Sequence, residues 1–459
     1  METKEKNEQN FTDSYIKMLE LQKKNKKKFT ETITFKGLII GLLILILLIP
    51  QSMITGLIHE RKHRSAEAIH RINEKWSLAQ TITPPVLTLP HTVKVIEHET
   101  VNGERREKIS HRTNHINIAP SRVNINVEIF PEQRSYGIYK ATLYRSELTI
   151  SGSFDNLDEF DSLDGKWDLA YITIGISDLK GLVSDAAFTI NGITYAAEVG
   201  GRTNWIDGNS LKIPLKDFEK LPNEKNEFNT TITLNGSEAL NFIPVGKITQ
   251  VNVSGNWASP SFAGNFTPQS SVENGVFSAK WYIMHFNRNI PEAWDEPRMR
   301  FDDSAFGVRL IETVNHYQQN ERSAKYAIMF LALTFAVFFF VEIFTGKKIH
   351  PVQYLLVGLA LILFYSLLLS ISEKIGFEMA YLTASVATVS LITAYSYSIF
   401  KNKLQTAIMC LFLCILYTFL FVILRLEDTA LLIGSIGLFI ILGACMYISR
   451  KINWYKLEK

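Results

Sequence analysis

Apolar residues form two different patterns along this chain. Near both ends they run together for about twenty residues at a time, whereas in the middle they alternate with polar residues in short runs. An uninterrupted apolar run of that length is what a helix needs to cross a hydrocarbon core of roughly 30 Å. Alternation with a period of two is typical of a strand with one buried face. The patterns therefore predict a membrane part built of helices and a separate part built of strands.

The long apolar runs predict six transmembrane helices. The first covers about residues 37–58, contains Pro50 and lacks a small-residue cleavage site, so we expect a retained signal anchor. A short juxtamembrane helix should follow it and end before Pro84. The chain enters the bilayer again at Ala324. The remaining apolar runs predict a tight up-down bundle of five helices over residues 324–344, 352–370, 379–400, 404–424 and 430–448.

The alternating runs lie between about Thr92 and Phe306 and are separated by Gly, Asn, Asp and Pro. Asn191-Gly192 and Asn235-Gly236 lie between apolar runs and predict hairpin turns. We therefore predict an α+β membrane protein whose extracytoplasmic domain is mainly antiparallel β, a sandwich or a related layered sheet. Within it, the stretch SGNWASPSFAGNFTP favours a rigid irregular loop over a strand, because it has two prolines and closely spaced aromatic residues.

Lysine and arginine residues predict how the helices are oriented. A basic cluster at residues 23–28 precedes the first apolar run, and Lys347, Lys401 and Arg450 mark three further basic segments on the same side. The opposite connectors, SEKIGFE and RLED, are net acidic. We expect both termini in the cytoplasm of a cell with an inner membrane. The expected domains are a cytoplasmic tail (1–36), a first transmembrane helix (37–58), a periplasmic β-rich domain (59–323), a five-helix bundle (324–449) and a second cytoplasmic tail (450–459).

Composition limits the kinds of partner that we expect this chain to bind. The chain is 47% apolar and 20% charged with a net charge of only +3, so the lipid bilayer is expected as a partner and nucleic acid is not. All three cysteines, Cys410, Cys414 and Cys445, fall in apolar runs, and the β-rich domain must therefore fold without disulfides. The one-turn spacing of Cys410 and Cys414 suits buried thiols better than a metal site, because no His or carboxylate lies nearby on that run.

Motifs for chemistry are missing from the sequence. It contains no HExxH, GxSxG, P-loop or GxGxxG, so we expect no enzymatic activity and no metal or cofactor. Six histidines between residues 91 and 316 are scattered and are expected to be ordinary surface or core residues: His91, His98, His111, His115, His285 and His316.

Several residues are candidates for function, each with a structural alternative. Glu342, near the end of the second span, is either a functional carboxylate or one that reaches the membrane interface. Glu321 can pair with Lys325 four residues later, and Arg322 and Tyr326 form a second row beside them. These two rows either anchor the helix at the interface or dock the β-rich domain onto the bundle.

Two further candidates lie in connectors, and one group lies in the β-rich part. His350 precedes Pro351 and fits a helix start, whereas Glu373 belongs to an outer connector where solvation is expected. In the predicted loop, the candidates either pack aromatic side chains into the core or form a binding surface: Pro260, Ser261, Phe262, Gly264 and Pro268.

Long segments of the chain resemble the CreD family of envelope-integrity proteins. The resemblance rests on ERSAKYAIMFLALTFAVFFFVE, on KKIHPVQYLLVGLALILFYSLLLSISEKIGF, on the block from Arg134 to Phe154, on the PSFxGxFxP-like segment and on the terminal INWY. Glu60, Arg61, Trp76 and Gln80 also match the family, while Pro84 stands where a Gly is expected; further matches cover the first anchor and nearly all of residues 303–455.

The resemblance implies a role in cell-envelope integrity or the envelope stress response, with no established reaction. Three classes of function follow for this chain. The first is a non-enzymatic protein whose β-rich domain binds an envelope protein or a cell-wall component, the second a transporter or channel built on the bundle, and the third a membrane-bound enzyme. The lack of catalytic motifs and of charges at depth in the apolar runs favours the first. The sequence sets no oligomeric state.

Overall fold

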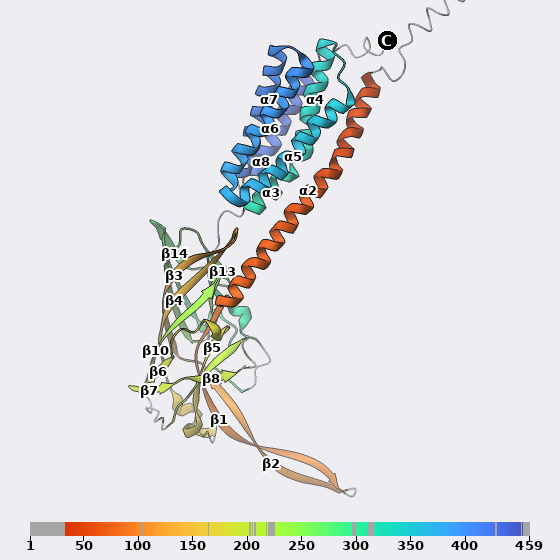
Figure 1. Cartoon of the computed structure of the whole chain (residues 1–459). Helices are drawn as coiled ribbons and strands as arrows, with labels where there is room; N and C mark the ends of the chain where they lie inside the picture. The colour runs from red at the N-terminus through yellow and green to blue at the C-terminus, as the bar shows by residue number, and fades with distance from the viewer. Residues whose placement is uncertain are drawn as a thin grey trace, which may run out of the picture. The chain divides into compact units, whose positions relative to one another are not determined.

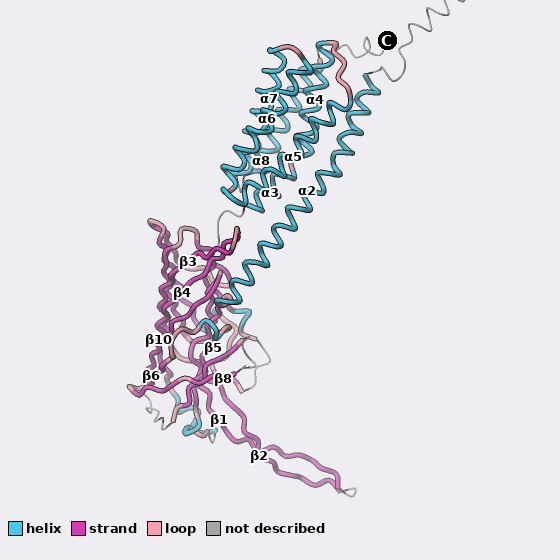
Figure 2. The backbone as a smooth tube through the Cα atoms, viewed as in Figure 1, coloured by secondary structure: helices cyan, strands magenta, loops and turns pink. Residues whose placement is uncertain are grey.

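The computed structural model divides the chain into two compact units. We call residues Met1–Arg64 and Val314–Lys459 the helix unit, and residues Ser65–Thr313 the β unit. Figures 1 and 2 show the helices of the first and the strands of the second. The structure describes residues 33–452 except for 102–103, 164, 202, 204, 206–207, 217, 219–224, 296–299, 311–315, 427–428 and 451. The basic cluster at residues 23–28 therefore lies outside the described residues.

The predicted membrane architecture is confirmed for the part of the chain that the structure describes. Six helices are long and apolar enough to cross a membrane. The helices are α2 (Ile33–Trp76), α3 (His316–Lys325), α4 (Ala327–Thr345), α5 (Pro351–Ile375), α6 (Phe377–Phe400), α7 (Lys403–Arg425) and α8 (Ala430–Ser449). Of these, the short polar α3 is the one that does not qualify as a span.

The first helix differs from the prediction. Instead of a span ending near Ile58 and a separate juxtamembrane helix, α2 is one helix of 44 residues with Pro50 inside it. Its charged part stays helical because neighbouring charges alternate in sign along one face, as in the pair between Arg64 Nη2 and Glu60 Oε1 at 2.6 Å. No proline or glycine follows Gly56 before the helix ends at Trp76.

The core of the helix unit is made of aliphatic and aromatic side chains, with small residues where helices come close. Ala380, Ala384 and Thr388 form one buried stripe on α6, as expected for close helix packing. The connector between α5 and α6 is shorter than predicted. Glu373 belongs to the last turn of α5, and only Gly376, with φ of 80°, separates the two helices.

The β unit contains two sheets whose described strands are mostly antiparallel, as predicted. One sheet has the order β13-β17-β11-β1-β5-β9-β8, with β2 beside β1 and β16 beside β2; the other has the order β14-β15-β12-β3-β4-β10-β6-β7. Within the described strands, the β1–β11 and β3–β12 pairs are parallel. Figure 2 shows the long β1–β2 hairpin extending beyond the rest of the β unit.

The strands have the following bounds: β1 (Gln80–Val101), β2 (Glu104–Ile118), β3 (Arg122–Tyr136), β4 (Tyr139–Phe154), β5 (Tyr171–Ile176), β6 (Ala187–Ile190), β7 (Ile193–Ala196), β8 (Glu198–Gly201), β9 (Asn209–Pro214), β10 (Asn226–Ser237), β11 (Ala239–Phe242), β12 (Ile248–Asn256), β13 (Pro260–Gly264), β14 (Gln269–Glu273), β15 (Val276–Met284), β16 (Ala293–Trp294) and β17 (Phe306–Leu310).

Both sheets contribute to one hydrophobic core, as expected for a layered sandwich. Buried residues of the first sheet, such as Ile82 and Ile174, belong to the same cluster as Ile125 and Ile150 of the second. Burial alternates along the first nine residues of β3 and throughout β12 and β15, which is the pattern that the sequence predicted. The Asn191-Gly192 turn joins β6 to β7 with both residues at positive φ, so this hairpin is confirmed.

Two local predictions in the β unit are wrong. Asn235 and Gly236 do not form a turn but lie within β10, where a Cβ on Gly236 would come within 2.3 Å of the Tyr144 hydroxyl. Glycine is needed there for close approach rather than for a turn. The segment around Pro260 is not an irregular loop but includes the strand β13, which lies at the edge of its sheet. Proline is tolerated there because an edge strand has unpaired backbone groups on one side.

Candidate functional site

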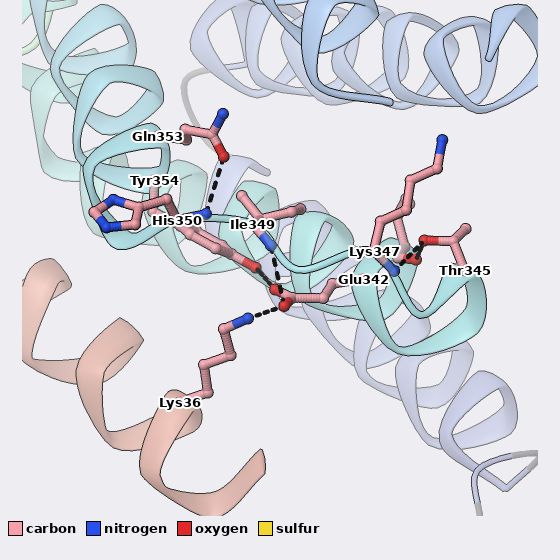
Figure 3. A network of polar contacts seen from close by, with 9 residues as sticks. Lys36, Glu342, Thr345, Lys347, Ile349, His350, Gln353 and Tyr354 are labelled. Carbon is pink, nitrogen blue, oxygen red and sulfur yellow. Dashed lines mark hydrogen bonds and ion pairs between the residues drawn. The ribbon is translucent and has the colours of Figure 1, made fainter. Parts of the chain in front are cut away.

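A buried carboxylate near the end of α4 is the centre of the most connected polar site in the helix unit (Figure 3). Glu342 is only 8% exposed. Its Oε1 accepts from the Lys36 ammonium of α2 and from the Ile349 backbone N–H at 3.2 Å, and its Oε2 accepts from the Tyr354 hydroxyl at 3.2 Å. One carboxylate thus joins α2, α4, the following connector and α5.

The connector between α4 and α5 brings these donors to Glu342. Gly346 ends α4 in the left-handed region with φ of 66°, and its N–H donates to the Glu342 carbonyl at 2.9 Å. Four residues later His350 caps α5, where its Nδ1 accepts from the Val352 N–H at 3.3 Å. Gln353 Oε1 completes the cap by accepting from the His350 N–H at 2.9 Å. His350 therefore begins a helix, as the sequence predicted.

The structure changes the interpretation of Glu342. The sequence left open whether Glu342 is a functional carboxylate or one that reaches the membrane interface; the structure adds that its side chain is buried and that three donors satisfy it. Burying a carboxylate is costly unless a cation and hydrogen bonds compensate for its lost hydration. Sequence reasoning missed Lys36 and Tyr354; Lys36 directly precedes the first apolar run and was counted as part of the predicted cytoplasmic tail.

A second polar cluster is centred on Glu321 of α3. The Lys62 ammonium of α2 lies 3.0 Å from its Oε2, and the Lys325 ammonium lies 3.4 Å from its Oε1. The expected pairing of Glu321 with Lys325 is thus present, but Lys325 is 69% exposed whereas Lys62 is 44% exposed. The hydrogen bond from Lys62 is the main cause that holds the pKa of Glu321 below its usual value.

Arg322 and Tyr326 serve other elements of the helix unit. Arg322 Nη2 donates to the Leu426 carbonyl at 2.8 Å, and Leu426 is the C-terminal cap of α7. A guanidinium there compensates for the unsatisfied carbonyls at a helix end. Tyr326 lies at the break between α3 and α4 and packs against the hydrophobic core. The hypothesis that this row docks the β-rich domain stays a prediction.

The polar helix α3 is tied to α5 by side-chain hydrogen bonds. The Tyr317 hydroxyl donates to Glu373 Oε1 at 3.1 Å, so Glu373 is partnered rather than merely solvated. Asn320 Nδ2 donates to Ser372 Oγ at 2.8 Å, and both residues are buried. The structure thus ties Glu373 to α3, the helix that carries Glu321 and Arg322, although the sequence had placed Glu373 in a separate connector.

Among the candidates in the β unit, Phe262 packs against the hydrophobic core. Phe262 packs edge-on against Trp281 with ring centres 5.8 Å apart, and the Trp281 indole donates to the Phe266 carbonyl at 3.0 Å. Gly264 has a φ of 98°, and a Cβ there would come within 2.2 Å of the Ala305 carbonyl oxygen. Pro260 and Ser261 pair with Leu310 and Arg309 of β17. Pro268 follows β13 and precedes β14.

No group of three or more His, Cys, Asp or Glu residues with metal-ligand geometry occurs among the described residues. All three cysteines are free thiols.

Comparison with known proteins decides the family. The family model of "Inner membrane protein CreD" matches residues 32–455. This chain belongs to the CreD family. Inner membrane protein CreD of Escherichia coli (strain K12) is 30% identical over 421 residues, which cover 90% of this chain and 91% of that relative. CreD membership confirms the resemblance found in the sequence and accounts for the apolar helices that flank the β unit.

Solved structures add no argument to the CreD assignment. An M1 zinc metallopeptidase from Deinococcus radiodurans aligns with 36% of this chain and 38% of its own length, at 10% identity and a TM-score of 0.19. The same enzyme bound to a Tyr-Ser-Ala substrate aligns at 12% identity and a TM-score of 0.20. Both scores are too low to carry a conclusion about fold or activity.

Proposed function

We propose that this CreD-family protein contributes to cell-envelope integrity or the envelope stress response, and that it does so without catalysis by binding an envelope protein or a cell-wall component. In this proposal the β unit lies in the periplasm and both termini lie in the cytoplasm. The positions of Lys347, Lys401 and Arg450 support this orientation, because all three follow helices that end on the same side if successive helices alternate in direction.

The observation that carries the proposal is the construction of the β unit. It has a hydrophobic core of its own, drawn from both sheets, so it does not need the helix unit to bury its apolar residues. Its surface has open cavities, among them one of about 420 Å³ that includes Asn114, Tyr171 and Lys212 and one of about 430 Å³ beside Trp76. A large, self-supporting domain with recesses of this size is suited to recognising a ligand.

The orientation is tested with alkaline-phosphatase fusions. A fusion after Trp281 should be active, because the enzyme needs an oxidising compartment, and a fusion after Lys348 should be inactive. Expression of both fusions is checked by immunoblot. The reverse pattern would overturn the orientation, and with it the proposed place of binding.

The envelope role is tested in a deletion strain of the source organism. The strain should leak a periplasmic reporter and become sensitive to detergent under envelope stress, and the parent gene should restore both. A photo-crosslinking residue at exposed Tyr282 of the β unit should then give a recurrent adduct, while the same residue at exposed Leu411 of α7 serves as the membrane control. An intact envelope in the deletion strain under every stress applied would contradict the proposal.

One observation favours a second candidate function, a transporter built on the helices. Glu342 is a buried carboxylate paired with Lys36, and ionisable residues at such positions often mark an ion or substrate path. The two functions differ in a simple prediction. If the protein is a transporter, Glu342→Gln should fail to restore the envelope of the deletion strain even when the folded variant reaches the membrane in normal amount. If the protein acts by binding, the folded variant should restore the envelope as the parent does.

A further inference from the structure

The β unit has a cavity whose walls combine positive charge with an apolar floor. It has a volume of about 430 Å³ and lies between the C-terminal turns of α2 and the hairpin formed by β3 and β4. Three cations line it: Arg71 and Lys75 of α2 and Arg134 of β3. None of the described residues that line this cavity is acidic. A recess with this composition has an unbalanced positive charge.

Helical spacing separates the charged wall from the apolar floor. Arg71 and Lys75 are four residues apart and therefore lie one above the other on α2. Ile72 and Trp76 share the same spacing and form the neighbouring apolar row, and buried Leu143 of β4 completes the floor. A ligand that fits must therefore present an anionic group to one wall and an apolar segment to the floor.

The cavity is a built feature, because its helical wall is fixed to the sheets. Asn73 is buried and its Nδ2 donates to Glu238 Oε1 at 2.7 Å. The Lys180 ammonium donates to the Glu74 carbonyl at 2.9 Å. On the opposite wall, the Arg134 guanidinium lies 4.1 Å from the centre of the Trp76 ring. The cavity walls are thus held before any ligand arrives.

One carboxylate near the cavity already neutralises part of its positive charge. Glu132 Oε1 accepts from Arg134 Nε at 2.9 Å, and both side chains are about half exposed. The Arg134 guanidinium also carries two terminal nitrogens, and a guanidinium can bind an oxyanion with two parallel hydrogen bonds. Arg71 and Lys75 are exposed, so a bound anion would add its charge without displacing a buried partner.

We propose that this cavity binds an anionic amphiphile, a phosphate-bearing lipid whose headgroup meets Arg71, Lys75 and Arg134 and whose acyl chain begins on Ile72, Trp76 and Leu143. The inference rests on the proposed function, because it names the class of envelope component that the β unit recognises. A lipid fits better than an acidic peptide, since the cavity combines three cations with an apolar floor on which an acyl chain can pack.

The test uses the full chain, purified and reconstituted in nanodiscs. The probe is phosphatidylglycerol brominated near the carboxyl end of its acyl chain, because bromine quenches tryptophan fluorescence only at short range. Brominated phosphatidylcholine at the same mole fraction is the zwitterionic control. The chain has seven tryptophans, so the difference in quenching between the parent and Trp76→Phe gives the contribution of Trp76.

Trp76 should be quenched at least about twofold more by the anionic lipid than by the zwitterionic one. The double variant Arg71→Glu/Lys75→Glu should weaken the apparent affinity for the anionic lipid on the order of tenfold or more, because it reverses the charge of two of the three cations. Arg145→Glu is the matched control, since Arg145 is an exposed arginine of β4 that does not line the cavity. Arg134→Gln gives a milder loss and guards against misfolding of the double variant.

Several results would overturn the proposal. Equal quenching by the two lipids, or quenching that the double reversal leaves unchanged in a folded protein, would show that no anionic headgroup is recognised. Removal of the difference by millimolar inorganic phosphate would indicate a site for a free anion, and removal by hexaglutamate a site for an acidic peptide. This assay uses purified protein, so a negative result contradicts lipid binding but not the envelope role. A negative result in the deletion strain contradicts the envelope role but not the measured lipid binding.

Discussion

Replacing Glu342 by Gln tests whether the buried ion pair stabilises the helix unit. The change keeps the size of the side chain but removes the charge that faces Lys36. Tyr354 and the Ile349 N–H lose an ionised acceptor and keep at most a neutral one. The expected result is a less stable protein that still folds, because the remaining amide oxygen can accept one of these hydrogen bonds.

The size of the effect follows from the burial of the two side chains. Breaking a fully buried pair costs about 3–5 kcal/mol, and losing one hydrogen bond to a charged group costs about 1.5–3 kcal/mol. Glu342 is 9% exposed in its side chain but Lys36 is 24% exposed, so water can partly solvate the ammonium that is left. We therefore expect a loss of about 2 kcal/mol, which is roughly a 30-fold change in the unfolding equilibrium.

The assay is reversible unfolding in mixed micelles with increasing sodium dodecyl sulfate, followed by loss of helical circular dichroism. Lys36→Met and the double variant complete a double-mutant cycle, and the coupling should be about 1.5 kcal/mol. Glu378→Gln is the matched control. Its partner Arg425 belongs to another helix, but both side chains are about 60% exposed, so the loss should stay within about 0–1 kcal/mol. If Glu342→Gln behaves like Glu378→Gln, the buried pair does not have the role argued here.

Four further predictions follow from other contacts. The stabilisation by Glu321 should be present above about pH 4.5 and lost as the pH falls through its lowered pKa, so the stability difference between the parent and Glu321→Gln should vanish in acid melting experiments. Arg322→Gln should lower stability by about 0.3–1 kcal/mol in thermal melting, because α7 loses a cation at its C-terminus, whereas Arg322→Lys should retain part of it. Gly236→Ala should cost about 1–3 kcal/mol and lower the Tm, because the new methyl group meets the buried Tyr144 ring. The excised β unit, residues 65–313, should give a β-rich circular dichroism spectrum that reductant does not change, since it contains no cysteine; a helical spectrum would contradict this.

Sequence periodicity predicted those parts of the fold where burial depends on one element and its nearest neighbours. The apolar runs located the membrane helices, and alternation located strands such as β3 and β12, because every second side chain there is buried. Prediction failed where a residue type has two uses. Gly236 permits a close approach of Tyr144 instead of a turn, and Pro260 starts an edge strand instead of a loop. The choice depends on neighbours that are distant in sequence.

The candidate site shows more clearly that local sequence patterns do not reveal contacts between distant residues. The residues Glu342 and His350 were found because each is unusual in its own segment. The pairing of Glu342 with Lys36 joins residues 306 positions apart, and no local pattern indicates it. The sequence alone therefore gave no sign that Glu342 is buried, since a carboxylate near a helix end normally reaches water unless a cation from another helix meets it. Arg71, Lys75 and Arg134, the three cations that line the cavity beside Trp76, likewise come from two segments separated by more than one strand of sheet.

The two polar clusters of the helix unit are built in the same way, from a lysine and a glutamate that lie far apart in the sequence. In each, a lysine of α2 meets a glutamate of the α3–α4 segment: Lys36 with Glu342, and Lys62 with Glu321. The two lysines are 26 residues apart on one helix, which corresponds to about 39 Å at 1.5 Å per residue, slightly more than the hydrocarbon core of a bilayer. A spacing of this length suits one pair at each end of a membrane span, and apolar side chains such as Leu47 lie between the two pairs. Apolar packing alone permits helices to slide along each other, since lipid and leucine are similar environments. Two ion pairs at the ends of the same interval fix the register of α2 against the α3–α4 segment, because a shift of α2 by one helical turn would break both pairs at once.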